Sequence, residues 1–385
     1  MEAAAGSVHR LLAGNASGLR PSDIRLITQH IARESLTPLR LDIGEPDLPT
    51  PDRIVQAAIE ASRLPSRYAP AAGTTAFREA ASAYLLREHA LAVSPEDIVA
   101  TPGATGGLAA VFALLCEPGD EVLVPTPGFP SYRTQLALVG AVPVGYQLRG
   151  DRGWIPDLEQ LAKAVTGRTK AIVLNTPGNP TGAVLDAATL DGILQLAEER
   201  DLVVISDEVY LDLALEGTAV SASSRGRDRV FSILSLSKAF SMTGWRIGFT
   251  VTPPGLAPYL AAVLAQLTAS VSSVAQHAAV AALAGPGEEL SHRRRVFRER
   301  RDAVHGYLRE HHIPHTVPRG AFYQILPLPD GHDSMTEALA LLRDGVAVVP
   351  GTAFGEPDGP FLRLCLTAPS PTLIAGLDLV RQRLW

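Results

Sequence analysis

The chain has 385 residues, of which 46% are hydrophobic and 19% are charged, and its net charge is −6. This composition is typical of a globular protein with a large core, and it gives no reason to expect nucleic acid or an anionic membrane as a partner. The sequence has no uninterrupted apolar run long enough to span a membrane and no signal-peptide pattern at its start, so we expect a cytoplasmic protein. Cys116 and Cys365 lack metal-ligand spacing, which predicts neither a metal site nor a disulfide framework.

The first 90 residues predict three helices and two turn-rich loops. Residues 1–20 are small and polar and predict a loose arm. The apolar spacing that follows predicts helices over 23–34, 52–63 and 74–90. Gly44 precedes three prolines within six residues, and this stiff turn either holds a backbone group at a site or simply connects two elements. Tyr68 stands in the second loop, where packing is the alternative to a functional role.

From residue 97 onward, apolar strands alternate with helical stretches. The strands are rich in β-branched residues, as is typical of parallel sheets that helices cover on both faces. They are predicted at 98–101, 122–124, 142–144, 171–174, 202–205 and 230–234, and the sheet region ends near 247–251. The fold class is therefore α/β, with a mostly parallel central sheet in a large domain.

The remainder of the chain predicts helices and then a smaller α+β domain. One long Ala-rich helix is expected over 256–284, followed by basic helices to about Glu310. The arginine-rich run at 293–301 alternates with apolar positions at helical spacing, which is typical of a solvated helix face. Short strands and helices alternate over the last 70 residues, including apolar strands near 320–326, 346–349 and 361–366.

Three strand ends carry loops that suit a flat, phosphorylated ligand. Ala104 and Thr105 lie in a small-residue turn that opens a helix, whose free amides and dipole favour an anion; an ordinary tight turn is the alternative. Phe129 follows the next strand and can either stack on a flat ring or pack in the core. Asn179 lies in the loop Asn-Thr-Pro-Gly-Asn-Pro-Thr-Gly (175–182), whose two prolines and two glycines fix its amide as a donor.

Two charged residues occur where an apolar neighbourhood makes an unpaired charge costly. Asp207 directly follows a very apolar strand and needs a cationic partner. A protonated ring nitrogen would serve through a charge-assisted hydrogen bond, and a helix N-cap is the alternative. Arg363 lies inside the apolar run 361–366, where either a substrate carboxylate or an internal Asp or Glu would be its partner.

Lys238 is the candidate nucleophile, in the loop that follows the strand at 230–234. An arginine stays protonated and cannot act as an amine nucleophile, and the chain has only three lysines. The other two, Lys163 and Lys170, stand in polar surroundings typical of solvated side chains. Three neighbouring groups can hold an anion beside Lys238, namely Ser235, Ser237 and Arg246.

An amine nucleophile, a phosphate cup, a stacking aromatic ring, a donor to a ring hydroxyl and an acid for a ring nitrogen are the groups that pyridoxal 5′-phosphate needs. The chain resembles the class I/II (fold type I) PLP-dependent aminotransferases of the aspartate aminotransferase superfamily. The resemblance runs from about residue 20 to the C-terminus. Its most specific motifs are at 175–182, at 206–210 (Ser-Asp-Glu-Val-Tyr) and at 235–248 (Ser-Leu-Ser-Lys with Gly-x-Arg-x-Gly).

The resemblance implies a role for each matching residue. Lys238 would be the Schiff-base lysine and proton shuttle, with Asp207 and Tyr210 as its catalytic partners. The cofactor-binding residues would be Tyr68, Ala104, Thr105, Phe129, Asn179, Asp207, Tyr210, Ser235, Ser237, Lys238 and Arg246. The substrate would contact Gly44, Asn179 and Arg363. Tyr68 matches a tyrosine that reaches the neighbouring subunit's phosphate, which implies a homodimer with shared active sites.

We therefore expect transfer of an α-amino group between an L-amino acid and a 2-keto acid by a ping-pong mechanism. A PLP-dependent lyase, cyclase or oxidase on the same fold is the alternative, and a non-catalytic sensor domain is a more distant one. The expected organisation is an N-terminal arm and part of a small domain over 1–44, a large PLP-binding domain over 45–280, and a C-terminal small domain over 281–385. The sequence does not identify the amino acid or the keto acid.

Overall fold

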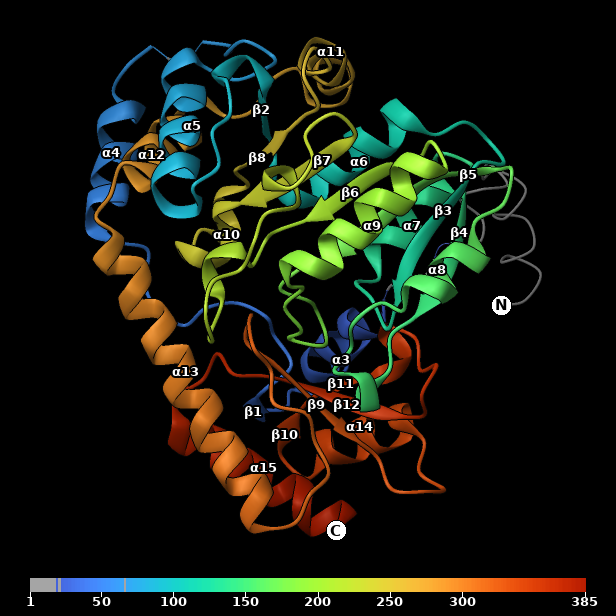
Figure 1. The fold of residues 1–385 in the computed structure, drawn as a ribbon. Coiled ribbons are helices and arrows are strands. Elements are labelled where there is room, and N and C mark those ends of the chain that lie inside the picture. The colour runs from blue at the N-terminus through green and yellow to red at the C-terminus, as the bar shows by residue number, and fades with distance from the viewer. Residues whose placement is uncertain (1–18, 20–21, 66) are drawn as a thin grey trace, which may run out of the picture.

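The computed structural model describes residues 19, 22–65 and 67–385, so the arm expected over 1–20 lies almost entirely outside the described residues. Its centre is a seven-stranded sheet in the order β2-β8-β7-β6-β5-β3-β4 (Figure 1). The strands are β2 (Ile98–Thr101), β3 (Glu121–Thr126), β4 (Val142–Gln147), β5 (Thr169–Asn175), β6 (Val203–Asp207), β7 (Val230–Ser235) and β8 (Gly248–Val251). Only β8 runs antiparallel to its neighbours, which confirms the predicted mostly parallel sheet.

Helices cover both faces of this sheet, as the nearly continuous apolar strands require. On one face α6 (Gly103–Leu115) and α7 (Ser131–Leu138) share a core with β3, β5 and β7. On the other face α8 (Leu158–Ala164) and α9 (Ala187–Glu199) pack on β5 and β6, and Figure 1 shows these two pairs on opposite sides of the sheet. Six 3₁₀ turns accompany the sheet and the loops, η1 (Pro95–Asp97), η2 (Gly150–Arg152), η3 (Leu211–Leu213), η4 (Ala222–Ser224), η5 (Thr243–Trp245) and η6 (Gly351–Ala353).

Three helices pack together beside the β2–β8 end of the sheet. These are α4 (Asp52–Ser62), α5 (Thr75–His89) and α12 (Ser273–Leu283), and the first two confirm predicted helices. The single helix expected over 256–284 is wrong, because the chain forms α11 (Ala257–Thr268) and then α12. Ala269 has a φ of +59°, and the Ser272 hydroxyl caps α12, so the polar stretch between them turns the chain. This turn lets α11 pack on α6 and α12 on α4.

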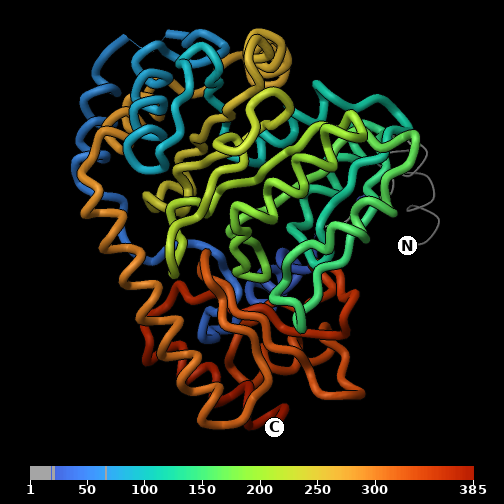
Figure 2. The backbone as a smooth tube through the Cα atoms, in the orientation of Figure 1, coloured from blue at the N-terminus to red at the C-terminus, as the bar shows by residue number. Residues whose placement is uncertain are grey.

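The basic segment is one 24-residue helix, α13 (Gly287–Glu310), rather than several helices. It runs along the left-hand side of the molecule and joins the upper part to the lower part (Figures 1 and 2). The expected solvated arginine face is wrong for Arg293, Arg300 and Arg301, which are buried. Arg300 pairs with Asp47 at 2.7 Å and Arg301 pairs with Glu216 at 2.8 Å. Tertiary partners, which helical spacing alone does not reveal, make this burial possible.

The lower part contains two small sheets built from both ends of the chain. A three-stranded antiparallel sheet has the order β11-β12-β9, and β1 pairs in parallel with β10. The strands are β1 (Leu39–Arg40), β9 (Tyr323–Pro327), β10 (Val346–Ala347), β11 (Val349–Pro350) and β12 (Phe361–Cys365). The helices are α3 (Asp23–Arg33), α14 (Ser334–Arg343) and α15 (Ser370–Leu384). The helix α3 and the strand β1 thus lie among C-terminal elements (Figure 1).

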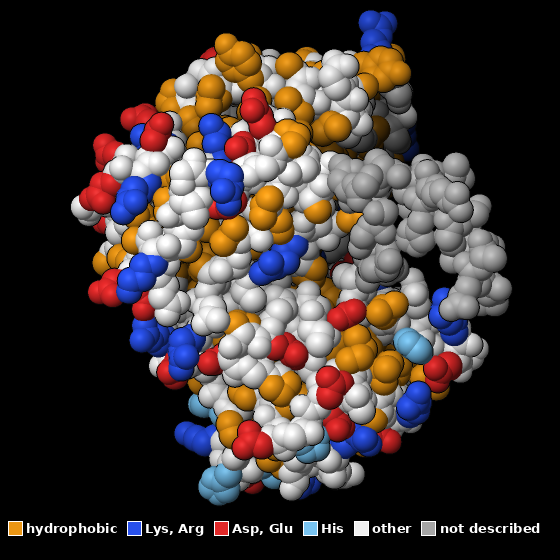
Figure 3. All heavy atoms as spheres, turned by 90° about the vertical axis from the view of Figure 1, so that its right-hand side faces the viewer, with side chains coloured by type: hydrophobic (Ala, Val, Ile, Leu, Met, Phe, Trp, Pro, Cys, Tyr) orange, Lys and Arg blue, Asp and Glu red, His pale blue; other side chains and the backbone are white. Residues whose placement is uncertain are grey.

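The next features are the surface charges, the apolar character of the helices and the state of the two cysteines. On the face in Figure 3, basic and acidic side chains are interspersed rather than gathered in one basic area. Among the described residues, no helix combines the length and the apolar character needed to cross a bilayer. Cys116 and Cys365 are both free thiols.

Two helical glycines give a matched test of the packing. A Cβ on Gly376 in α15 would overlap Leu41 Cδ1, whereas a Cβ on Gly306 in α13 meets nothing within 4 Å. We expect Gly376→Ala to lower the free energy of unfolding by about 1–3 kcal/mol through overpacking. Gly306→Ala should raise it by about 0.5–1 kcal/mol, because alanine favours the helix. Denaturant unfolding at one protein concentration measures both changes, and a stabilising Gly376→Ala would contradict the packing described here.

Candidate active site

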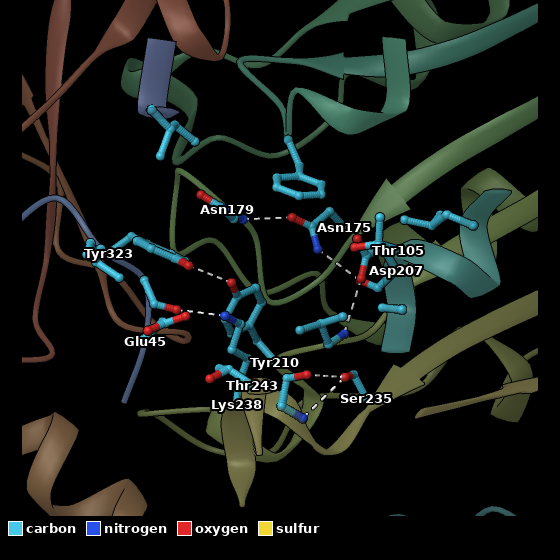
Figure 4. Close-up of a pocket in the computed structure, with 18 of the residues that line it drawn as sticks. Glu45, Thr105, Asn175, Asn179, Asp207, Tyr210, Ser235, Lys238, Thr243 and Tyr323 are labelled. Carbon is cyan, nitrogen blue, oxygen red and sulfur yellow. Dashed lines mark hydrogen bonds between the residues drawn. The ribbon is translucent and has the colours of Figure 1, made fainter. Parts of the chain in front are cut away.

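A cavity of about 400 Å³ lies between the large sheet and the three-stranded sheet and gathers most of the predicted site residues (Figure 4). The predicted residues that line it are Gly44, Ala104, Thr105, Phe129, Asn179, Asp207, Tyr210, Ser235, Ser237, Lys238, Arg246 and Arg363. Many of them follow the carboxyl ends of parallel strands, where ligands of open α/β sheets bind. Tyr68 is the exception, because it is 89% exposed and does not line the cavity.

Lys238 enters the cavity from the short helix α10 (Leu236–Ala239), which directly follows β7. Its Nζ donates a hydrogen bond to the Gly44 carbonyl oxygen at 2.7 Å. Desolvation lowers the pKa of the Lys238 amine to about 8, against an opposing effect of the Glu45 carboxylate. About a tenth of this amine is therefore neutral at pH 7 and able to attack an aldehyde carbon.

Asp207 ends β6 and is 4% exposed. Its Oδ2 accepts a hydrogen bond from the Tyr132 hydroxyl at 2.6 Å, and its Oδ1 accepts one from the Val209 amide at 3.3 Å. Burial raises the pKa of the Asp207 carboxyl to about 6, although the Tyr132 hydrogen bond opposes that rise. No α-helix follows that Asp207 could cap, since Tyr210 is the N-cap residue of η3. A buried carboxyl of this kind would gain from a cation in the cavity.

Asn179 is fixed by a chain of hydrogen bonds from neighbouring strand ends. Its backbone N–H donates to Asn175 Oδ1 at 2.7 Å, and Asn175 Nδ2 donates to the Asp207 carbonyl at 2.9 Å (Figure 4). Asn175 and Asp207 are direct partners in the β5–β6 register. The Asn179 Oδ1 accepts from Arg363 Nη1 at 3.1 Å, which leaves the amide Nδ2 as the donor for a ligand.

One end of the cavity carries hydrogen-bond donors suited to a phosphate. The first turn of α6 supplies backbone amides at Ala104 and Thr105, and Ser235 Oγ lies 2.9 Å from Ser237 Oγ. A Cβ on Gly103, whose φ is +69°, would lie 2.5 Å from Arg246 Nη2, so only glycine lets this guanidinium approach α6. Hydroxyls, amides and a guanidinium together fit a dianionic group.

Arg363 is 2% exposed, and among the described residues no acidic side chain pairs with it. Its Nη2 donates to the Asp42 carbonyl at 2.6 Å and to Cys365 Sγ at 3.3 Å, and its Nε has no partner. The guanidinium carbon lies 4.6 Å from the centre of the Tyr323 ring. The structure thus gives no support to the internal acid that the sequence left open, and a carboxylate in the cavity would satisfy this charge.

Several residues of the site were not identified from the sequence, and four of them support or adjoin the predicted groups. Tyr132 holds Asp207, Asn175 holds Asn179, Val209 lines the cavity beside Asp207, and the Tyr323 hydroxyl lies 2.6 Å from that of Tyr210. Asn175 lies in the motif at 175–182 and Val209 in the motif at 206–210. Their places within these motifs were the signal that could have identified them. Tyr132 stands three residues after Phe129 at the end of the same turn, which was its available signal. Tyr323 gave no comparable signal, since a buried tyrosine in an apolar run indicates packing.

The remaining lysines agree with the sequence interpretation. Lys163 and Lys170 are exposed, and Lys163 lies 3.7 Å from Glu159 in a surface ion pair. Neither lines the cavity, so Lys238 is its only lysine among the described residues.

The chain is similar to known aminotransferases over almost its whole length. The family model for aminotransferase class I and II matches residues 37–375. A probable aspartate/prephenate aminotransferase of Aquifex aeolicus is 36% identical over 393 residues, which cover 97% of this chain and 98% of that protein. The structure of an aspartate aminotransferase from Thermus thermophilus with maleate has a TM-score of 0.91 at 33% identity, and covers 97% of this chain and 99% of that one. An alanine aminotransferase from Pyrococcus furiosus has a TM-score of 0.89 at 31% identity, with the same coverage.

The lowered pKa of Lys238 predicts how the cofactor-free protein reacts with added pyridoxal 5′-phosphate. The pKa of this amine lies below its ordinary value, so its neutral fraction increases as the pH rises through about 8. We expect the rate of covalent attachment to rise roughly tenfold between pH 7 and pH 9. Borohydride reduction and peptide mass mapping should locate the adduct on Lys238. Lys163 and Lys170 serve as internal controls, and labelling of all three lysines at similar rates would contradict the desolvated amine.

Proposed function

The chain belongs to the class I and II aminotransferases, and on this basis we propose that the cavity around Lys238 is its active site. The enzyme depends on pyridoxal 5′-phosphate and transfers an amino group between an amino acid and a keto acid. The proposed assignment of the site rests chiefly on one observation. The desolvated Lys238 amine and the buried Asp207 carboxyl line the same cavity, and their pKa values are displaced toward each other.

The cofactor's groups find matching partners in this cavity. When bound, pyridoxal 5′-phosphate supplies an aldehyde that captures amines and a ring that withdraws electrons from the substrate's α-carbon. Lys238 Nζ would hold the aldehyde carbon, and Asp207 would keep a proton on the ring nitrogen. Asn179 and Tyr210 would donate to the ring oxygen. The phosphate would be held by Ala104, Thr105, Ser235, Ser237 and Arg246.

Phe129 and Val209 both line the cavity and would supply apolar contacts to a flat ring. Phe129 packs edge-to-face on Tyr132, at 5.6 Å between ring centres, so the tyrosine that holds Asp207 also supports the aromatic wall. Tyr132 thus fixes both the Asp207 carboxyl and the Phe129 ring. Less reorganisation is then needed when a flat ring binds in the cavity.

Substrate binding would use Arg363 and the Gly44 backbone. Arg363 would grip the α-carboxylate, with the guanidinium already oriented by Asp42 and Asn179. Lys238 Nζ lies on the Gly44 carbonyl at 2.7 Å, so the amine stands beside the segment that would contact the carboxylate. From there the Lys238 amine would take the proton from the substrate's Cα and deliver it to the carbon that had carried the cofactor's aldehyde oxygen.

A lyase, cyclase or oxidase would use the same cofactor groups. The relatives named above are all aminotransferases, and they favour amino transfer over these alternatives. To test amino transfer, the holoenzyme is mixed with amino donors and keto acids, and the products are identified by mass. Release of ammonia, pyruvate or peroxide without any added keto acid would support the alternatives instead.

We also propose the cellular and structural setting. The enzyme would be cytoplasmic, in keeping with its two free thiols. Residues 45–280 would form a large domain, and residues 1–44 would join 281–385 in a small domain, as the β1–β10 pairing suggests. The enzyme would be a homodimer with shared active sites, because the highly exposed Tyr68 is free to reach a neighbouring subunit.

Arg363→Lys should separate carboxylate binding from the rest of the reaction. A lysine cannot reproduce the forked guanidinium, so kcat/KM for α-amino acids should fall about 10- to 100-fold. Primary amines without a carboxylate should be affected much less, and the ratio of the two kcat/KM values is the measurement. The exposed Arg149→Lys is the control. An equal loss for both kinds of donor would indicate a structural role for Arg363.

Tyr68→Phe tests the shared site. Light scattering should give about twice the 40.7 kDa of one chain. Loss of one hydrogen bond to the phosphate should raise the dissociation constant for pyridoxal 5′-phosphate about 5- to 10-fold. Tyr259→Phe is the matched control, because Tyr259 is also exposed, at 63%. A monomeric protein, or equal cofactor affinity in the two variants, would count against a cross-subunit role.

A further inference from the structure

We infer that this active site prefers an amino acid with an uncharged, largely aliphatic side chain over one with a second carboxylate. The inference rests on the proposed function and deepens it by naming the substrate class. The names of the relatives leave this point open, since they include aspartate, prephenate and alanine. The cofactor and the α-carboxylate account for only part of the cavity lining. The remaining lining residues would face the substrate's side chain.

The charged side chains that line the cavity limit which substrates it can bind. Five charged side chains line it among the described residues, namely Glu45, Asp207, Lys238, Arg246 and Arg363. All three cations have a role already, as the amine nucleophile, the phosphate ligand and the α-carboxylate ligand. A dicarboxylic substrate needs one further cation for its distal carboxylate, because an unpaired carboxylate in a partly desolvated site is costly. Within one subunit, the described residues that line the cavity offer none.

Nearby arginines do not fill this gap. Arg40 is bound by both carboxylate oxygens of Asp42, at 2.8 and 2.9 Å. Arg25 follows the cavity residue Ile24, but Arg25 itself is exposed and does not line the cavity. Arg300 is bound by both oxygens of Asp47 at 2.7 Å.

The part of the cavity wall that has no role in binding the cofactor or the α-carboxylate is largely aliphatic. Ile24 and Ile43 present aliphatic side chains, and Thr28 adds one neutral hydroxyl. The helix α3, which carries Ile24 and Thr28, packs on β11, and β11 is the direct partner of the strand that holds Arg363. A substrate anchored by its carboxylate at Arg363, with its Cα beside Lys238, therefore directs its side chain toward a wall that includes α3. Such a wall suits apolar groups.

Glu45 also lines the cavity, and its charge has the wrong sign for a dicarboxylate. Glu45 is exposed, and its field acts on the Lys238 amine. A second substrate carboxylate would meet this anion without a compensating cation. The site thus combines an attractive surface for aliphatic side chains with a repulsive element against acidic ones, which is how binding sites gain specificity.

The donor preference can be measured in the first half-reaction, which needs no keto acid. The holoenzyme is mixed with leucine, methionine, norvaline, aspartate or glutamate, and the cofactor's absorbance change gives kcat/KM for each donor. The neutral donors should exceed the acidic ones by about tenfold or more. Aspartate or glutamate as the best donor would overturn the inference and leave the proposed function intact. An absence of absorbance change with every donor would overturn the proposed function and the inference together.

Two charge variants test the cause of the preference. Ile24→Lys adds a cation to the aliphatic wall and should raise the ratio of the glutamate to the leucine value about tenfold. Gln29→Lys adds the same charge to α3 outside the cavity lining and should leave that ratio unchanged. Glu45→Gln should raise the same ratio several-fold, with Glu34→Gln as its control. Equal ratios in each variant and its control would overturn the assignment of this wall.

Equilibrium binding gives a readout that does not depend on turnover. Isocaproate and glutarate have similar lengths but differ in one end group, a branched alkyl group or a second carboxylate. Titration calorimetry on the holoenzyme should show isocaproate binding about tenfold more tightly. Tighter binding of glutarate would contradict the neutral wall, whatever the kinetic constants are.

Discussion

The proposed active site depends on the partial exclusion of water from the Lys238 amine. Burial lowers the pKa of that amine to about 8 and raises the pKa of the Asp207 carboxyl to about 6. One physical cause thus prepares both groups, because a low-dielectric site disfavours the charged form of each. The strand ends supply the position, since Lys238 follows β7 and Asp207 ends the adjacent β6.

The second requirement is that two sheets hold their groups against each other. Arg363 on β12 donates to Asn179, which follows β5 of the large sheet, and to the carbonyl of Asp42 near β1. The buried Arg300 of α13 pairs with Asp47, three residues after Gly44, so the long helix also fixes the loop beside Lys238. Loss of one of these contacts would leave a buried guanidinium partly unpaired. The free-energy cost of an unpaired buried guanidinium therefore stabilises the observed placement of the two sheets.

In the proposed site, the groups that would serve the cofactor are separate from the groups that would select a substrate. The polar cofactor groups come mainly from loops at the end of the large sheet, whereas Ile24 and Thr28 come from α3 beside the small sheet. Changes in α3 can therefore alter the wall that faces a side chain while the phosphate cup and Asp207 remain in place. Such a division fits a family whose members differ in the amino acid for which they are named.

The sequence alone determined the strand and helix alternation, the lysine, and the short motifs around Asn179, Asp207 and Lys238. These features are local, because strand periodicity and turn residues act within a few positions of each other. Only the tertiary structure decided the burial of Arg293, Arg300 and Arg301, and the support that Tyr132 and Tyr323 give to Asp207 and Tyr210. Their partners lie far away in the chain, and no local pattern specifies which distant groups the fold will bring within hydrogen-bond distance.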